Sequence, residues 1–456
     1  MTSRTASMPR RGHAPVLLAV IAGVFATVSC GPAAMRKPDC DAWTTGEFFE
    51  TASVRDVATC VHTDGDIHAR DADLNTLLHL AARYANDPRI LTTLIDAGLD
   101  VQARNRSRTQ PLHYAAGFND DPAFITTLLN AGAELEGRNG IGFTPLHFAA
   151  RYNQSVVMLT ALLSAGADVH SQHGLDGTPL HVAAAFNENA EVVRTLIDAG
   201  ADPDLVNRSG YTPLHSAGTN ETAGVVTALL AAGADVNATH RDEGTPLHTA
   251  AGANKNPQVI RLLVAAGADL EARNENGQTP LHVAAAINRT VAVVEALLHA
   301  HRNAGLGIAP RNNAGNTPLH VAAAANINPL VIVALVRGGA SVHARNDYGG
   351  TPLHSFALHR APFRSRRGPD GGRLPLPGSL IVGTLVTLSA DKDAQDNYGR
   401  TPLHVAALYN EEISIFEALL SVEPNVNVRD DEGNTPLRYV HDEDIIAVLI
   451  EAGATY

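Results

Sequence analysis

Apolar residues return in the same order along most of the chain, once every 33 or 34 residues. In 178–211, TPLHVAAAFNENAEVVRTLIDAGADPDLVNRSGY, a short alanine-rich run is followed by a second apolar run, AEVVRTLIDAG. One face of the second helix would carry Val192, Val193, Leu196 and Ile197. The remaining stretch is rich in Asp, Asn and Gly, which is typical of an extended hairpin loop. The pattern therefore predicts pairs of helices separated by loops and repeated along the chain.

The residues that flank each apolar run predict where the helices begin and end. Thr178 is expected to cap the first helix, and Pro179 suits its first position, where a missing N–H costs nothing. Gly200 is expected to end the second helix in the left-handed conformation. Asn187 follows the first helix, and because asparagine tolerates that conformation, we expect it to close the helix in the same way.

A Thr-Pro-Leu-His motif opens most of the units. Three consecutive copies supply Thr144, Pro145 and His147, then Thr178, Pro179 and His181, then Thr212, Pro213 and His215. From the first motif histidine to Arg438, which takes its place in the last copy, the successive spacings are 34, 34, 34, 34, 33, 34, 38, 34, 50 and 34. Such a period indicates stacked repeats rather than several globular domains. The two long spacings predict a longer loop at 299–312 and an insertion at 359–378, between the two helices of one unit.

The TPLH motif and the closing Ala-Gly-Ala-Asp of 199–202 and 232–235 resemble the ankyrin repeat family, over about 43–456. The resemblance implies an all-α solenoid of about 11–12 helix-turn-helix repeats with projecting hairpin loops. It also implies that the motif histidine bonds the backbone of neighbouring loops and that the threonine caps the helix. Residues 43–72 are expected to form a degenerate cap repeat, with helices in TGEFFETA and VRDVATCV.

The repeated histidines do not point to catalysis. Equivalent residues of stacked helices lie about 8–10 Å apart, so ten of them would form a row. Catalysis and metal binding both need groups that converge on one point. The chain also has no HExxH, CxxC, GxSxG or phosphate-loop motif. We therefore expect a protein that is not an enzyme and holds no cofactor or metal.

Aromatic residues stand five positions after the histidine in four consecutive units, at Tyr84, Phe118, Tyr152 and Phe186. Arg83 and Arg151 precede two of them. In ankyrin repeats this position is variable and faces the concave groove, which favours a partner-binding surface, because aromatic residues dominate interface energetics. The alternative is that these rings pack on the turn between the helices and are structural.

The 359–378 insertion is basic and rich in Pro and Gly. Its arginines are Arg360, Arg364, Arg366, Arg367 and Arg373. Such a loop on an acidic protein suits an acidic partner or lipid headgroups. A tolerated surface insertion is the alternative.

The N-terminus resembles an export signal, predicted at 1–29. Two arginines precede an apolar run of 15 residues at 14–28, which is shorter than the roughly 20 residues of a membrane span. Thr-Val-Ser-Cys at 27–30 resembles the bacterial lipobox, which would make Cys30 a lipidated membrane anchor at the start of a linker over 30–42. Ordinary signal-peptidase cleavage and an uncleaved anchor are the alternatives.

The two other cysteines, Cys40 and Cys60, form an even pair, which in an oxidising compartment favours a disulfide. The alternative is that Cys60 is simply a buried apolar residue.

Charge and composition restrict the class of partner that the protein can bind. The chain is 45% hydrophobic and 18% charged, as a folded protein should be. Its net charge of −13 disfavours nucleic acid. We expect a monomeric scaffold, periplasmic or anchored at the envelope, that binds a protein partner through its concave face and loops. The alternatives are a secreted effector acting in a host cell, and an enzyme or enzyme accessory that uses the 359–378 insertion.

Overall fold

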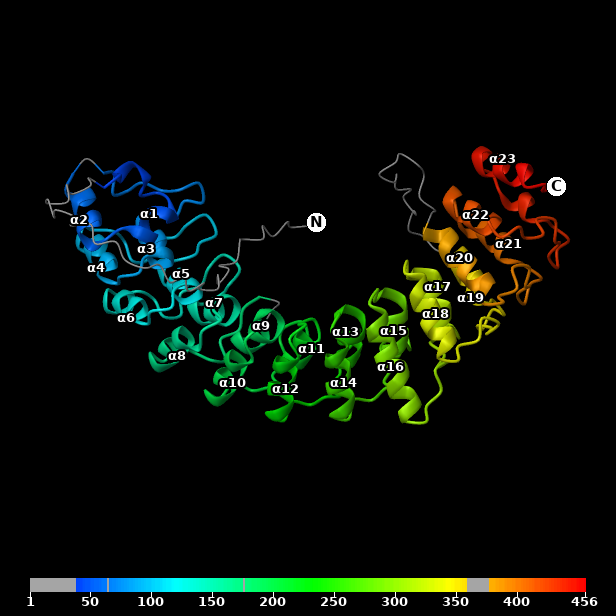
Figure 1. The fold of residues 1–456 in the computed structure, drawn as a ribbon, viewed down its shortest axis with the longest axis horizontal. Helices are drawn as coiled ribbons and strands as arrows, with labels where there is room; N and C mark the ends of the chain where they lie inside the picture. Colours follow the sequence, from blue (N-terminus) through cyan, green and yellow to red (C-terminus); the bar gives the residue numbers. More distant parts are fainter. Residues whose placement is uncertain (1–37, 64, 175–176, 359–376) are drawn as a thin grey trace, which may run out of the picture. The chain divides into compact units, whose positions relative to one another are not determined.

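The computed structural model describes residues 38–63, 65–174, 177–358 and 377–456. Residues Asp39–Tyr456 belong to one compact unit, in which the helices follow one another in chain order (Figure 1). Over the described ranges the chain contains helices and three isolated bridges but no strand. The predicted all-α solenoid of helix pairs is confirmed.

Among the described residues, the helices form twelve pairs after a short 3-10 helix, η1 (Cys40–Ala42). The first helices of the pairs are α1 (Gly46–Thr51), α3 (Leu77–Tyr84), α5 (Pro111–Phe118), α7 (Pro145–Tyr152), α9 (Pro179–Phe186), α11 (Pro213–Ala217), α13 (Pro246–Ala253), α15 (Pro280–Ile287), α17 (Pro318–Ala325), α19 (Pro352–Ala357), α21 (Pro402–Tyr409) and the 3-10 helix η2 (Pro436–Tyr439). The second helices are α2 (Val54–His62), α4 (Arg89–Asp96), α6 (Ala123–Asn130), α8 (Val156–Ser164), α10 (Ala190–Asp198), α12 (Ala223–Ala231), α14 (Pro257–Ala265), α16 (Val291–Asn303), α18 (Pro329–Arg337), α20 (Pro377–Thr387), α22 (Ile413–Leu420) and α23 (Glu443–Glu451).

The pairs stack in two rows. First helices contact the first helices of the adjacent pairs, as α5 does with α3 and α7, and second helices contact second helices, as α14 does with α12 and α16. Each pair therefore buries its apolar residues against its neighbours rather than in a core of its own. The result is one continuous core from Trp43 to Ala454.

The unit at 178–211 buries the residues that its sequence pattern marked. Leu180, Val192, Val193 and Leu196 are fully buried. Ile197, which was expected on the same face, is only half-buried because it lies at the edge of the core. The buried apolar face of the second helix is thus narrower than predicted.

Gly200 ends α10 as expected. Its φ is +97°, and its N–H donates to the Ile197 carbonyl while that of Ala201 donates to Leu196. These two bonds satisfy carbonyls that the end of a helix leaves free. The equivalent position after α20 holds Ser389, which adopts a φ of +74° with the same pair of bonds. A side chain therefore occupies a left-handed position that favours glycine.

Two sequence predictions about the ends of helices are wrong. Asn187 does not close α9 in the left-handed conformation, since its φ is −86° and its ψ is 137°. The extra residues of the 38-residue spacing do not form a longer loop at 299–312 either. They lengthen α16, which has thirteen residues where α14 and α18 have nine.

The two ends of the stack depart from the regular repeat. The expected cap helices are present as α1 and α2. In the last unit η2 replaces the first α-helix, and Arg438, in the histidine position, is exposed.

Several predicted features lie outside the described residues. These are the signal segment at 1–29, Cys30, and the arginines Arg360, Arg364, Arg366, Arg367 and Arg373 of the insertion. Helix α20 already begins at Pro377, inside the range predicted for the insertion. In the part of the chain that the structure describes, every helix is too short or too polar to span a membrane.

Candidate functional site

Each motif histidine joins two consecutive repeats. The Thr178 N–H donates to Nδ1 of His181 over 3.3 Å, and the Thr178 hydroxyl lies 2.9 Å from the same nitrogen. Because Nδ1 accepts a hydrogen bond, Nε2 carries the proton, and it donates to the Tyr211 carbonyl over 2.9 Å. Tyr211 directly precedes the threonine of the next motif. The histidine thus holds the start of its own helix and the end of the following loop.

The same arrangement recurs along the stack. The distances from Nε2 to the next loop carbonyl run from 2.8 to 3.2 Å at His79, His113, His147, His181, His215, His248, His282, His320, His354 and His404. All ten side chains are buried. They form a row, and the described residues include no group of three His, Cys, Asp or Glu arranged to hold a metal ion.

Burial keeps these imidazoles neutral. Desolvation lowers the pKa to about 4 at His79, His113, His181, His215, His282 and His320, and to about 3 at His147. It also lowers the pKa of His248, His354 and His404. The bond to the loop carbonyl works in the opposite direction but is the smaller effect. A neutral imidazole with both nitrogens engaged is a structural connector rather than an acid–base catalyst.

Buried asparagines form a second set of links between repeats. The Asn187 side-chain amide donates to the carbonyls of Ala150 and Asn153 in the preceding unit, each over 2.9 Å, and its oxygen accepts the Asn189 N–H. This explains why Asn187 is extended rather than left-handed, because its side chain must reach back across the repeat boundary. The residues that bond the preceding unit through such a pair of carbonyls are Asn119, Asn153, Asn187, Asn220, Asn254, Asn288 and Asn326. Asn220 stands five residues after its motif histidine, whereas Asn187 stands six residues after His181.

The predicted aromatic residues come together with the two arginines in what we call the aromatic–arginine row: Arg83, Tyr84, Phe118, Arg151, Tyr152 and Phe186. The Phe118 and Tyr152 rings stack with centroids 5.2 Å apart and planes inclined by 27°. Tyr152 and Phe186 are 43% and 48% exposed, whereas Tyr84 and Phe118 are half-buried. The row therefore faces solvent at Tyr152 and Phe186, whereas Tyr84 and Phe118 pack partly against the core.

The arginines connect the rings of adjacent units. Cζ of Arg83 lies 4.9 Å from the Tyr84 ring centroid and 4.3 Å from that of Phe118. Cζ of Arg151 lies 5.3 Å from the Tyr152 centroid and 3.7 Å from that of Phe186. Each guanidinium thus stacks on its own unit and on the next one. Such contacts stabilise by about 0.5–1 kcal/mol where they are exposed.

Two further aromatic rings, which the sequence pattern did not mark, pack against rings of the row. Tyr114 lies 5.9 Å from Phe118, and the largely buried Phe148 lies 5.3 Å from Tyr152. Both directly follow a motif histidine, which is the signal that could have found them. Gly117 makes room for Phe148, since a Cβ at that glycine would lie 3.3 Å from the Phe148 ring.

Comparison with known proteins identifies the repeat. A family model for ankyrin repeats in three copies matches residues 78–173, 155–240, 220–306 and 378–456, and a single-repeat model matches 314–347. The chain belongs to the ankyrin repeat family. A similar solved structure is the human ASB11 ankyrin repeat domain, with 32% identity, 50% of this chain and 98% of that chain covered, and a TM-score of 0.42. A search of curated proteins gave no significant match.

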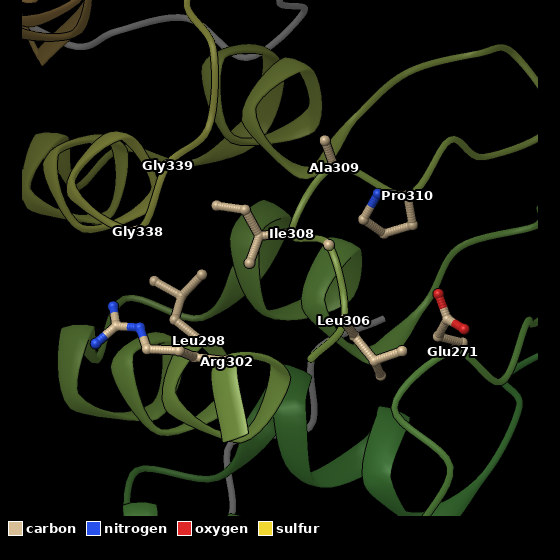
Figure 2. Close-up of a pocket in the computed structure, with 10 residues that line it drawn as sticks. Glu271, Leu298, Arg302, Leu306, Ile308, Ala309, Pro310, Gly338 and Gly339 are labelled. Carbon is tan, nitrogen blue, oxygen red and sulfur yellow. The ribbon is translucent and has the colours of Figure 1, made fainter. Parts of the chain in front are cut away.

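Ankyrin repeats are general protein-interaction modules and are typically not enzymes. One pocket, of 590 Å³, lies beside the lengthened α16 (Figure 2). Its charged lining residues are Glu271 and Arg302, which lie on opposite sides of the apolar Leu306 and Ile308 in Figure 2. The pocket therefore has no converging set of acid–base groups of the kind that catalysis needs.

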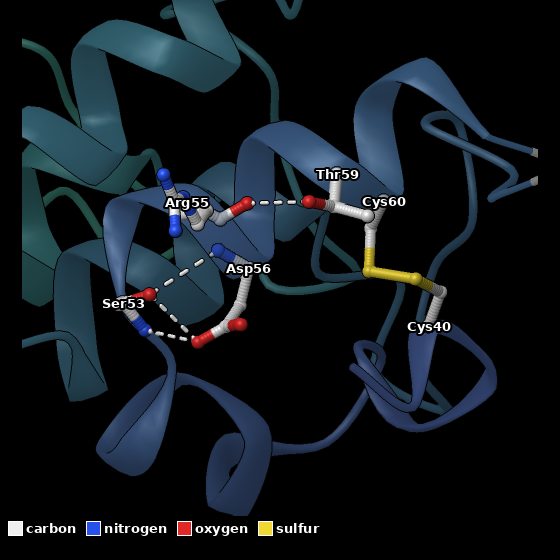
Figure 3. The surroundings of a disulfide bond; sticks show 6 residues. All are labelled: Cys40, Ser53, Arg55, Asp56, Thr59 and Cys60. Atoms are coloured by element: carbon white, nitrogen blue, oxygen red, sulfur yellow. Dashed lines mark hydrogen bonds between the residues drawn. A yellow bond between two sulfur atoms is a disulfide. The ribbon is translucent and has the colours of Figure 1, made fainter. Parts of the chain in front are cut away.

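The N-terminal end of the stack contains the two cysteines. The Sγ atoms of Cys40, in η1, and Cys60, in α2, lie 1.98 Å apart, as in a disulfide (Figure 3). Ser53 and Asp56 cap α2 reciprocally, with the Ser53 N–H donating to the Asp56 carboxylate over 2.9 Å. The disulfide and the capping box together hold the terminal repeat, which has a neighbour on one side only.

Proposed function

We propose that this ankyrin repeat protein is a non-enzymatic scaffold that binds a protein partner through the aromatic–arginine row. The observation that carries the proposal is the continuity of the row over four consecutive repeats, from Tyr84 to Phe186. Exposed aromatic residues and arginine are the side chains that dominate interface energetics. Since the folded chain already holds them in place, binding would lose little side-chain entropy.

We further propose that the chain is exported and held at the cell envelope. The apolar run at 14–28 and the lipobox-like residues before Cys30 favour this location. The Cys40–Cys60 pair also suits an oxidising compartment. Fractionation of cells that produce the full chain would test the location. Recovery in the envelope supports it, and recovery in the cytoplasm or in the medium would contradict it.

A pull-down from envelope extract tests the binding surface. We expect the Phe118→Ala/Tyr152→Ala variant to lose partner binding by about 30-fold or more, which corresponds to about 2 kcal/mol for a pair of hot-spot residues. The matched control is Tyr348→Ala/Tyr398→Ala, which removes two exposed rings from hairpin loops. A double variant that melts at a much lower temperature but binds normally per folded molecule would show that these rings are structural.

A further inference from the structure

The pocket of Figure 2 lies beside a helix that is about one turn longer than its neighbours. Helix α16 is the longest helix in the part of the chain that the structure describes, with thirteen residues against nine in α14 and α18. Its four additional residues, at about 1.5 Å each, carry its end about 6 Å further. The added turn and segment 306–310 face the end of α18 at Gly338 and Gly339, and the hollow lined by these residues is called the α16 pocket here (Figure 2).

The longer helix leaves Glu271, which lines this pocket, without the hydrogen bond that equivalent residues make. Glu271 stands eight residues before a motif threonine, and in other repeats the side chain at that position accepts an N–H from the next loop. These bonds join Glu136 to Asp168, Asp204 to Asp235 and Asn237 to Asp269, over 2.8–2.9 Å. The corresponding donor for Glu271 would be the N–H of Gly307, which follows the added turn. Among the described residues, the Glu271 carboxylate accepts no hydrogen bond and forms no ion pair.

A cation lies on the other side of the pocket. Arg302 belongs to the added turn and is exposed, and within the described ranges its guanidinium takes part in no hydrogen bond or ion pair. The half-buried Leu306 and Ile308 lie between Arg302 and Glu271 in Figure 2. The α16 pocket therefore has an apolar centre, a carboxylate on one side and a guanidinium on the other, and the two charges do not pair with each other.

From this arrangement we propose that the α16 pocket binds an extended segment of a partner protein, in which a basic and an acidic residue flank a large apolar residue. The apolar side chain contacts Leu306 and Ile308, the acid pairs with Arg302, and the basic residue pairs with Glu271. A peptide backbone also supplies the N–H donors that Glu271 lacks. The site is separate from the aromatic–arginine row and does not rest on it.

The size of the pocket and the geometry of a peptide fix the spacing of this motif. A volume of 590 Å³ lies in the range of about 300–1,000 Å³ in which proteins hold small ligands, so a few residues can enter. In an extended chain every second side chain points to the same face. The apolar residue should therefore stand two positions from each of the charged ones.

Selection of peptides on three full-length baits tests the proposal. The baits are the natural protein, Arg302→Glu and Glu271→Arg, and the library displays random peptides of about twelve residues. Peptides that bind elsewhere should be enriched on all three baits, so those that differ between baits report on the α16 pocket. We expect one acid and one base around the apolar residue on the natural protein, two bases on Arg302→Glu, and two acids on Glu271→Arg.

A matched control and an affinity measurement complete the test. Arg289→Glu makes the same change of charge at an exposed position just before the other end of α16, and it should select the same peptides as the natural protein. The best peptide from the natural protein should bind Arg302→Glu at least about ten-fold more weakly, because a charge-assisted hydrogen bond is replaced by repulsion. Replacing the acid of that peptide by lysine should restore its binding to Arg302→Glu.

The contrary results are distinct from a failure of the proposed function. If all the baits select the same peptides, the α16 pocket is not a peptide site. A fatty acid also combines an apolar chain with a carboxylate, so binding of dodecanoate that Arg302→Glu abolishes and Glu271→Arg strengthens, without bait-specific peptides, would overturn the peptide proposal. Phe118→Ala/Tyr152→Ala should leave the peptides of the α16 pocket unaffected, since it changes only the aromatic–arginine row.

Discussion

Acidification should unfold this protein through its row of buried histidines. At pH 8 the motif imidazoles are neutral in both the folded and the unfolded chain. As the pH falls below 6.5, the unfolded chain takes up protons first, whereas burial holds the folded pKa of His181 at about 4. Stability is therefore fully present above pH 6.5 and is lost progressively as the pH falls to about 4.

The size of the effect follows from the two pKa values. At pH 5 an imidazole with a pKa of 6.5 is almost fully protonated, and one with a pKa of 4 is about one-tenth protonated. The difference lowers the free energy of unfolding by about 2 kcal/mol for His181. Seven motif histidines have a pKa of about 3 or 4, so the loss for the whole stack should be several times larger.

A single substitution measures how much one histidine contributes to this loss of stability. In His181→Gln, the amide oxygen and nitrogen can take the places of Nδ1 and Nε2, so the cost at pH 8 should be at most about 1 kcal/mol. Since glutamine does not titrate, the variant should gain about 2 kcal/mol relative to the natural protein when both are moved from pH 8 to pH 5. Urea unfolding followed by circular dichroism at the two pH values measures this difference.

The control is His170→Gln, which removes an imidazole from an exposed loop position. A relative gain below about 0.5 kcal/mol for His181→Gln, equal to that of the control, would refute the claim that burial of the motif histidine makes folding pH-dependent.

Three further substitutions or treatments test other features of the stack. Asn187→Ala should lower the free energy of unfolding by about 2–3 kcal/mol, because two carbonyls of the preceding repeat lose their donor, and normal stability in urea would contradict this role. Ser389→Gly should raise stability by about 1 kcal/mol and Gly200→Ser should lower it by a similar amount, because both positions are left-handed; thermal melts that move the same way for both would be inconsistent with that reasoning. Cys40 and Cys60 should resist thiol labelling in folded, non-reduced protein, and reduction should cost about 3 kcal/mol, mainly in the first repeat; two reactive thiols would disprove the bridge.

Much of the fold could be predicted from the sequence because the same local signals recur in most of the repeats. The Thr-Pro start of the first helices and the glycine that ends α10 are local signals, and both appear in the structure. The role of Asn187 could not be predicted in this way, because its partners lie 34 and 37 residues earlier in the chain. Local reasoning offered only the left-handed turn that asparagine tolerates.

The lengthened helix α16 shows a different limit. The residues after Leu298 contain no glycine or proline until Gly305, and His301 continues the helical spacing from Leu297, whose carbonyl lies 2.8 Å from His301 Nδ1. This spacing favours a helix, but comparison with the shorter repeats directed the prediction toward a loop. In the candidate site, the positions of the aromatic residues could be predicted. The stacking of Arg83 on Phe118 could not, because it depends on how two repeats pack.

The links between repeats also determine how such a chain can change in length during evolution. His147 donates to the carbonyl of Gly177, and Asn220 donates to Ala184 and Asn187. If residues 178–211 were deleted, His147 would keep its acceptor, and Asn220 would meet Ala150 and Asn153, which are the equivalent carbonyls one repeat earlier. Duplication of the same segment would preserve the bonds equally well, whereas a deletion that is not a whole unit would leave donors and acceptors out of register. Gene rearrangements in whole units are therefore the changes that this architecture tolerates. Those that fall outside Tyr84–Phe186 would leave the aromatic–arginine row whole, whereas the deletion of 178–211 would remove Phe186 and with it the ring on which Arg151 stacks.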